Sequence, residues 1–79
     1  MKATVVVRPK RGILDPQGEA VERALGHLGF AVRGARVGKV VDLEVPGDDE
    51  AAAREQVERM CAQLLANPLI ESYEIELHG

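Results

Sequence analysis

Basic side chains gather around the loop that follows the first apolar run of the sequence. Lys10 and Arg11 precede the segment "GILDPQG" at 12–18, in which Asp15 and Pro16 form the pattern of a helix start, with Asp15 as cap and Pro16 at the first helical position. Cations beside a helix N-terminus can attract a phosphate or a carboxylate. The Asp15 carboxylate would already occupy that helix end, however, and neither GxxxxGK[ST] nor GxGxxG is present. The loop therefore predicts a solvated or protein-docking surface in preference to an anion pocket.

Residues suited to catalysis or to metal binding are few and scattered. His27 and His78 have no HxxxH spacing, and Cys61 is a single cysteine that cannot form a CxxC motif or an internal disulfide. We therefore predict no catalytic, cofactor-binding or metal-ligating residue in this chain. A copper chaperone of similar size would need CxxC in its first loop. An RNA-recognition module would need stacking aromatics, whereas this chain has only Phe30 and Tyr73 and a pI near 5.3, so we expect no nucleic-acid partner.

The length and composition are those of one small globular domain. A chain of 79 residues predicts a single domain over 1–79 with one small core, and a core of that size often needs a partner. The composition is 46% hydrophobic and 29% charged, and no apolar run reaches the roughly 18 residues that would cross a bilayer. The first residues lead directly into a strand-like segment without the pattern of a secretory signal. We expect a cytoplasmic protein with no membrane partner.

Elements that could position the basic residues follow from the apolar patterning. The run "KATVVVRP" predicts a strand at about 2–8, and a helix is expected at about 16–28, ending before Gly29. The stretch "AVRGARVGKVVDLEV" at 31–45 predicts two strands joined by a hairpin turn at Gly38 and Lys39.

The second half of the chain repeats the helix and strand pattern. Asp48 or Asp49 is expected to cap a second helix, which runs until the "NP" pair at 67–68. A last strand is expected where Tyr73, Ile75 and Leu77 alternate with glutamates. The predicted order βαββαβ is that of an α+β, ferredoxin-like fold. In that fold an antiparallel sheet of spatial order 4-1-3-2 carries two helices on one face.

Charge is divided between the two halves of the sequence. Residues 1–41 hold eight Lys or Arg against three acids, and residues 42–79 hold two against ten. In the predicted topology the first loop and the hairpin share one end of the domain, and the start of the second helix lies at the other end. This predicts a basic pole and an acidic pole. The expected basic pole comprises Arg8, Lys10, Arg11, Arg36 and Lys39. The residues expected to dock a partner are Lys10, Arg11, Arg36, Gly38 and Lys39.

Three segments together carry a resemblance to a known family. They are "LDPQGEAVERAL", "RVGKVVDLEV" and "MCAQLLANPLIESYEIEL", which follow one another in register. The resemblance as a whole extends over nearly the whole chain. In this respect the chain resembles the PurS family, the small subunits of phosphoribosylformylglycinamidine (FGAM) synthase. It departs from the family pattern only in a hairpin that continues as "VVDLEV" and in an alanine- and acid-rich "GDDEAAAREQ".

The resemblance implies a non-catalytic subunit of the fourth step of de novo purine biosynthesis. In that step formylglycinamide ribonucleotide, glutamine and ATP give formylglycinamidine ribonucleotide, glutamate, ADP and phosphate (EC 6.3.5.3, an ATP-dependent C–N ligase with glutamine as nitrogen donor). The implied partners are a glutaminase subunit that releases ammonia and a large synthetase subunit that uses ATP and Mg²⁺. A homodimer of the small subunit would hold them together for ammonia transfer. The small subunit itself would bind no cofactor. The resemblance leaves open whether the isolated chain is an enzyme, although we expect no catalytic residues in it.

One alternative function remains open at this level. Regulatory domains of the ACT kind share the βαββαβ order and bind small molecules through backbone groups at subunit interfaces, so they leave little sequence motif. An ACT-like small-molecule-binding domain is therefore the second hypothesis.

Overall fold

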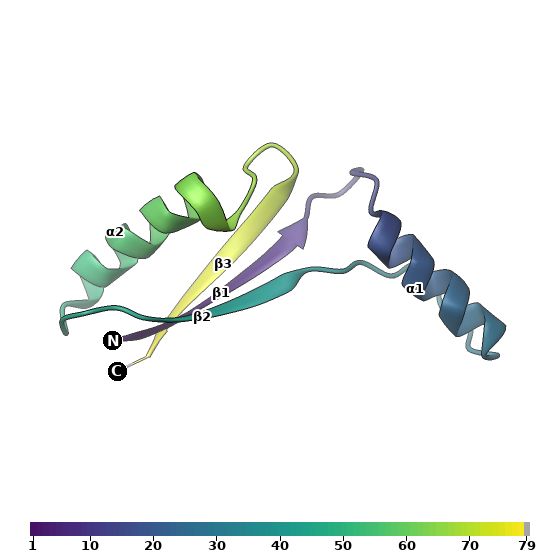
Figure 1. Cartoon of the computed structure of the whole chain (residues 1–79), viewed down its shortest axis with the longest axis horizontal. Helices are drawn as coiled ribbons and strands as arrows, with labels where there is room; N and C mark the ends of the chain where they lie inside the picture. The colour runs from purple at the N-terminus through teal and green to yellow at the C-terminus, as the bar shows by residue number, and fades with distance from the viewer. Residues whose placement is uncertain (79) are drawn as a thin grey trace.

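The computed structural model describes residues 1–78, which form an elongated molecule measuring 48 × 25 × 14 Å (Figure 1). In chain order its elements are β1 (Lys2–Pro9), α1 (Pro16–His27), β2 (Lys39–Glu44), α2 (Glu50–Met60), the π-helical turn η1 (Cys61–Leu65) and β3 (Glu71–His78). The α+β class is confirmed, and the arrangement is ferredoxin-like with two differences described below.

The strands form one antiparallel sheet in the order β2-β1-β3. Lys2 at the start of β1 lies opposite Glu44 of β2 and opposite His78 of β3. This order agrees with the prediction, because the strands expected third and fourth flank the first. Side chains of β1 alternate between the two faces of the sheet, as strand geometry requires. Those on the covered face are almost completely buried: Ala3, Val5 and Val7.

The second helix covers one face of the sheet. Asp49, one of the two residues predicted as its cap, begins this helix, since its Oδ1 accepts a hydrogen bond from the backbone N–H of Ala51 at 3.0 Å. Val57 and Cys61 from α2 and η1 are fully buried in the core that also holds the valines of β1. Burial of one valine side chain contributes about 1.5–3 kcal/mol. The helical region ends at Leu65, just before the predicted stop at 67–68.

The strand expected at about 31–37 is not formed, and neither is the hairpin at Gly38 and Lys39. Residues 31–38 run as an irregular segment, and β2 begins only at Lys39. The reason lies at Gly38, because a Cβ added there would stand 2.2 Å from the carbonyl oxygen of Val7. Gly38 therefore allows the chain to pass close to the end of β1, and it does not form a two-residue turn.

The first helix extends away from the sheet, which is the second difference from the predicted arrangement. Figure 1 shows α1 at the opposite end of the molecule from α2, with the segment 30–38 returning beside it. We call residues 10–38 the arm and the remainder the body. Apolar residues at helical spacing on α1 are largely uncovered: Val21 is 41% exposed and Leu28 is 72% exposed, whereas Leu25 is half-buried.

Candidate functional site

A basic pocket lies where the arm joins the sheet. It is lined by Val6, Val7, Arg8, Pro9, Arg36, Gly38, Lys39 and Val40. Three of the five predicted docking residues, Arg36, Gly38 and Lys39, thus come together at the start of β2, beside the end of β1. In Figure 1 this junction lies between the sheet and α1, at the end of the sheet away from the two termini.

The two arginines of the pocket are partly engaged within the chain. Arg8 Nη1 lies 3.5 Å from Glu74 Oε1 across the uncovered face of the sheet, and both side chains are well exposed. Arg36 Nη2 donates a hydrogen bond to the carbonyl oxygen of Pro9. Arg36 therefore helps to fix the base of the arm in addition to contributing positive charge, a role that the sequence did not indicate.

The other two predicted docking residues lie at the same end of the sheet but outside the pocket. Lys10 turns toward the loop before β3, where its Nζ donates to the carbonyl oxygen of Pro68 at 2.7 Å. Its backbone N–H donates to Ile70 at 2.8 Å. Arg11 lies exposed in the turn that follows. The five residues therefore form one basic pole where the arm joins the body, with Lys10 and Arg11 outside the pocket.

Asp15 joins the two segments of the arm. Its Oδ1 accepts a hydrogen bond from Gly18 N–H at 3.0 Å, as the predicted cap should, and its Oδ2 accepts one from Val37 N–H at 2.9 Å. The hydrogen bond from Val37, then that from Gly18, together with the nearby charge of Arg36, lower the pKa of the Asp15 carboxyl below its ordinary value of 3.8. Pro16 stands at the first helical position, as predicted. The bond to Val37 could not be read from the sequence, because it depends on where the return segment lies.

The acidic pole lies at the other end of the sheet. The N-terminal amine of Met1 donates to the carbonyl oxygens of Val45 at 2.7 Å and Gly47 at 3.1 Å. These bonds hold the segment that leads into α2 beside the start of β1. The acidic residues at 48–50 follow directly, so the predicted separation of the basic and acidic poles is present in the structure.

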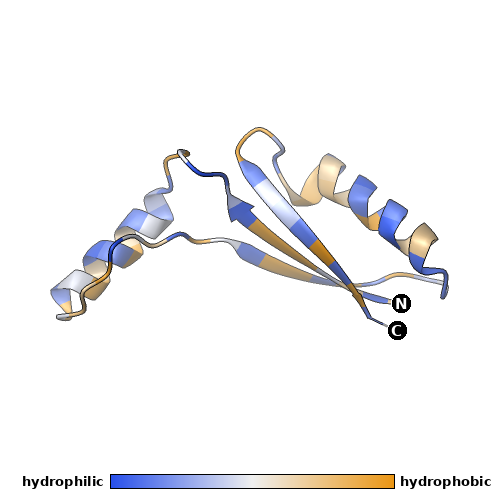
Figure 2. Cartoon of the chain, turned by 180° about the vertical axis from the view of Figure 1, so that it is seen from behind, coloured by the Kyte–Doolittle hydropathy of each residue, from blue (hydrophilic) through white to orange (hydrophobic). Residues whose placement is uncertain are grey.

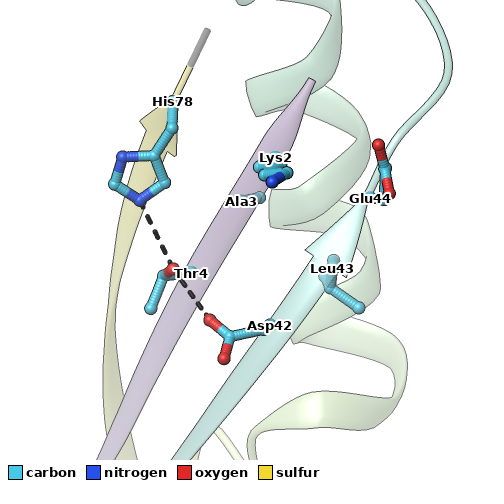
Figure 3. A pocket seen from close by; sticks show the side chains of 7 residues that line it. All are labelled: Lys2, Ala3, Thr4, Asp42, Leu43, Glu44 and His78. Carbon is cyan, nitrogen blue, oxygen red and sulfur yellow. Dashed lines mark hydrogen bonds between the residues drawn. The ribbon is translucent and has the colours of Figure 1, made fainter.

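A polar network crosses the uncovered face of the sheet near the acidic pole. In Figure 3, Thr4 lies between Asp42 and His78, and its hydroxyl donates to Asp42 Oδ1 at 2.9 Å and lies 3.4 Å from His78 Nε2. A nucleophile triad needs the histidine between the hydroxyl and the carboxylate, whereas here the hydroxyl is in the middle. The network therefore ties three strands together without activating a nucleophile. Sequence reasoning missed it because the strand register decides these neighbours.

The remaining chemistry-bearing groups are isolated. Within residues 1–78, no three His, Cys, Asp or Glu side chains come together in a way that could hold a metal ion, and no helix is long and apolar enough to cross a membrane. Cys61 is fully buried, and burial raises the pKa of its thiol above the ordinary value.

Comparison with known proteins shows the family to which the chain belongs. The family model for PurS, phosphoribosylformylglycinamidine (FGAM) synthase, matches residues 2–79. The chain belongs to the PurS family. The chain is 44% identical over 77 residues to the FGAM synthase subunit PurS of Methanocaldococcus jannaschii. The aligned residues make up 96% of this chain and 93% of that relative.

Solved structures share the fold as well as the sequence. The Bacillus subtilis PurS crystal structure superposes with a TM-score of 0.88 at 38% identity, covering 99% of this chain and 98% of that one. A chain in the structure of PurLQS from Thermotoga maritima superposes with a TM-score of 0.85 at 37% identity, covering 95% and 93%. With coverage this complete, the superpositions include the arm as well as the body.

Proposed function

We propose that this chain is the small subunit of an FGAM synthase, the ligase of the fourth step of de novo purine biosynthesis. Its role is to join a glutaminase subunit to a large synthetase subunit so that ammonia passes between them. The observation that carries the proposal is the match to a chain of a PurLQS assembly over 95% of this chain. The family match over residues 2–79 supports it, and the ACT-like alternative is not supported by any comparison.

We infer a division of labour among the subunits. ATP and Mg²⁺ act in the synthetase subunit, and glutamine hydrolysis belongs to the glutaminase. The described part of this chain supplies charged surface, with exposed basic residues where the arm joins the body and exposed acids at the opposite end of the sheet. We place the assembly in the cytoplasm. Within it the small subunit is a homodimer, because a core this small leaves apolar surface that association would cover.

We further propose that the basic pole, where the arm joins the body, docks an acidic surface of a partner subunit. Lys39, which lines the pocket, and Arg11, which lies outside it, are exposed, and neither forms a salt bridge or side-chain hydrogen bond within the described structure. Opposite charges across an interface raise the rate of association and make it sensitive to salt. Lys10, Arg36 and Gly38 complete the proposed docking surface.

The test uses a charge reversal at the two residues that have no internal role. The double variant Arg11→Glu with Lys39→Glu should keep its melting temperature and lose capture of the partner subunits from a native lysate containing glutamine, ATP and Mg²⁺. The matched control is Arg54→Glu on α2, an exposed position on the opposite side of the body from the arm. Capture of a glutaminase and an ATP-dependent synthetase by wild type supports the subunit assignment. Equal capture by the double variant overturns the docking surface alone.

A further inference from the structure

The sheet carries two pockets, one at each end. The first is the basic pocket where the arm joins the sheet, which we call the junction pocket; its volume is about 450 Å³. The second, of about 380 Å³, lies around the polar network near the two termini (Figure 3). Both volumes fall in the range of small-molecule sites, roughly 300–1,000 Å³. The two pockets therefore differ little in size, and their charge distinguishes them.

Of these two pockets, the junction pocket is the one without acids. Three of its eight lining residues are cations, Arg8, Arg36 and Lys39, and none is Asp or Glu. The pocket near the termini is lined by both Asp42 and Glu44. In Figure 2 the end of β1 that leads into the arm is hydrophilic, next to the apolar middle of the same strand. A small anion is therefore attracted to the junction pocket and repelled by the acids of the other.

The two arginines of the junction pocket are placed by contacts that leave N–H donors free. Arg36 Nη2 donates to the carbonyl oxygen of Pro9, and the guanidinium group has several further N–H donors. Arg8 Nη1 lies 3.5 Å from Glu74 Oε1, with the two side chains 59% and 75% exposed. Exposed ion pairs are weak, so a ligand of higher charge can replace Glu74 at Arg8. Both arginines can thus donate to a bound anion.

An apolar surface lies beside these cations. Val6 of β1 and Val40 of β2 are directly opposite each other, on the face of the sheet that α2 does not cover. Val40 is 62% exposed and Val6 is half-buried. Both valines line the junction pocket. Apolar surface next to a group of cations suits a ligand that carries its negative charge on a carbon framework.

We propose that the junction pocket binds a phosphate monoester. The phosphate is bound by Arg8, Arg36 and Lys39, and the carbon framework of the ligand lies over Val6 and Val40. Arginine suits this ligand because its planar guanidinium group donates paired hydrogen bonds to phosphate oxygens. No Ser, Thr, Cys, His, Asp or Glu lines the pocket, so the ligand is bound without being changed. The inference concerns this chain alone and does not depend on the proposed function.

Titration calorimetry on the full chain, at about pH 8 and low salt, tests the class of ligand. The probes are adenosine 5′-monophosphate, ribose 5-phosphate, inorganic phosphate and adenosine, and at this pH the phosphate group is a dianion. Both monoesters should bind more tightly than inorganic phosphate, and adenosine should not bind. The tighter monoester distinguishes a nucleotide from a sugar phosphate. The proposal is overturned if no phosphate compound binds, or if adenosine binds as well as its monophosphate.

Variants at the cations test the place of binding. The double variant Arg8→Gln with Lys39→Gln should raise the Kd of the tighter monoester about tenfold. Arg36 stays unchanged because its bond to Pro9 helps to fix the base of the arm. The matched control, Lys2→Gln with Arg54→Gln, removes two exposed cations outside the pocket and should leave the Kd near that of wild type. An equal loss in the control would show non-specific attraction and overturn the site. Melting curves verify that each variant is folded.

A change at Glu74 provides a measurement of the opposite sign. Glu74→Gln removes the carboxylate beside Arg8, so it should lower the Kd about threefold. Glu76→Gln is the control, because it removes an exposed acid of the same strand and the same face without touching that ion pair. Weaker binding by Glu74→Gln, or an equal gain in the control, contradicts a phosphate beside Arg8.

Discussion

Replacement of Gly38 by alanine should destabilise the protein strongly, although the residue is exposed and lies outside the core. The new Cβ would stand 2.2 Å from the Val7 carbonyl oxygen and 3.3 Å from its carbon. Reaching a tolerable separation of 3.0 Å requires the two backbones to move apart by about 0.8 Å. Val7 is fully buried and pairs with both neighbouring strands, so it has no room to move.

The size of the effect follows from known costs of overpacking. Forcing extra volume into a packed site costs about 1–3 kcal/mol. In a domain of this size each kcal/mol lowers the melting temperature by roughly 4–8 °C, so Gly38→Ala should melt about 5–20 °C below wild type. The matched control is Gly26→Ala in α1, where a Cβ meets nothing within 4 Å. Alanine is the better helix former by about 0.5–1 kcal/mol, so this variant should melt slightly above wild type.

Calorimetry at one fixed protein concentration provides the assay, because association makes the melting temperature depend on concentration. Comparable melting temperatures for the Gly38→Ala and Gly26→Ala variants would show that the crossing over Val7 is loose. The reasoning that fixes the base of the arm would then be refuted.

Three further predictions concern the core, the arm and the thiol. Val57→Ala should lower the free energy of unfolding by about 2 kcal/mol in denaturant titrations, because the Val57 side chain is fully buried. The control is Val40→Ala, which should change this free energy little, because Val40 is 62% exposed. Equal effects of the two substitutions would contradict the assigned core. Because the pKa of Asp15 is lowered on folding, its contribution to stability is present above pH 3.8 and is lost as the pH falls through the lower folded pKa. Asp15→Ala should therefore melt below wild type at pH 7 with a difference that shrinks in acid, and an unchanged difference would refute the assigned hydrogen bonds. Cys61 should react with a thiol reagent only when the protein unfolds, so rapid labelling of native protein would show that the buried position is wrong.

Much of the body could be predicted from the sequence because its signals are local. The β-branched run of β1, the cap at Asp49 and the stop after Leu65 each act within a few residues. The order of the three strands followed from the general rules for crossover connections. Asp15 was likewise predicted as a cap, since that role involves only the turn that follows it.

The placement of the arm could not be predicted, for a physical reason. The spacing of Val21, Leu25 and Leu28 indicates that one face of α1 is suited to burial, but periodicity does not say against which surface or in which molecule. Gly38 gave a similar ambiguity, because glycine suits both a tight turn and a close backbone crossing. The second hydrogen bond of Asp15 reaches a residue 22 positions away, beyond any local pattern.

The central claim, that this chain couples a glutaminase to an FGAM synthetase, is tested most directly by reconstitution. Purified glutaminase and synthetase subunits of the same source are supplied with formylglycinamide ribonucleotide, ATP and Mg²⁺, and formation of formylglycinamidine ribonucleotide is measured with and without this chain. With glutamine as the nitrogen source, product formation should depend on the chain. With ammonium chloride in its place, product should form without the chain, since no transfer between subunits is needed. Full glutamine-dependent activity in the absence of the chain would contradict the account.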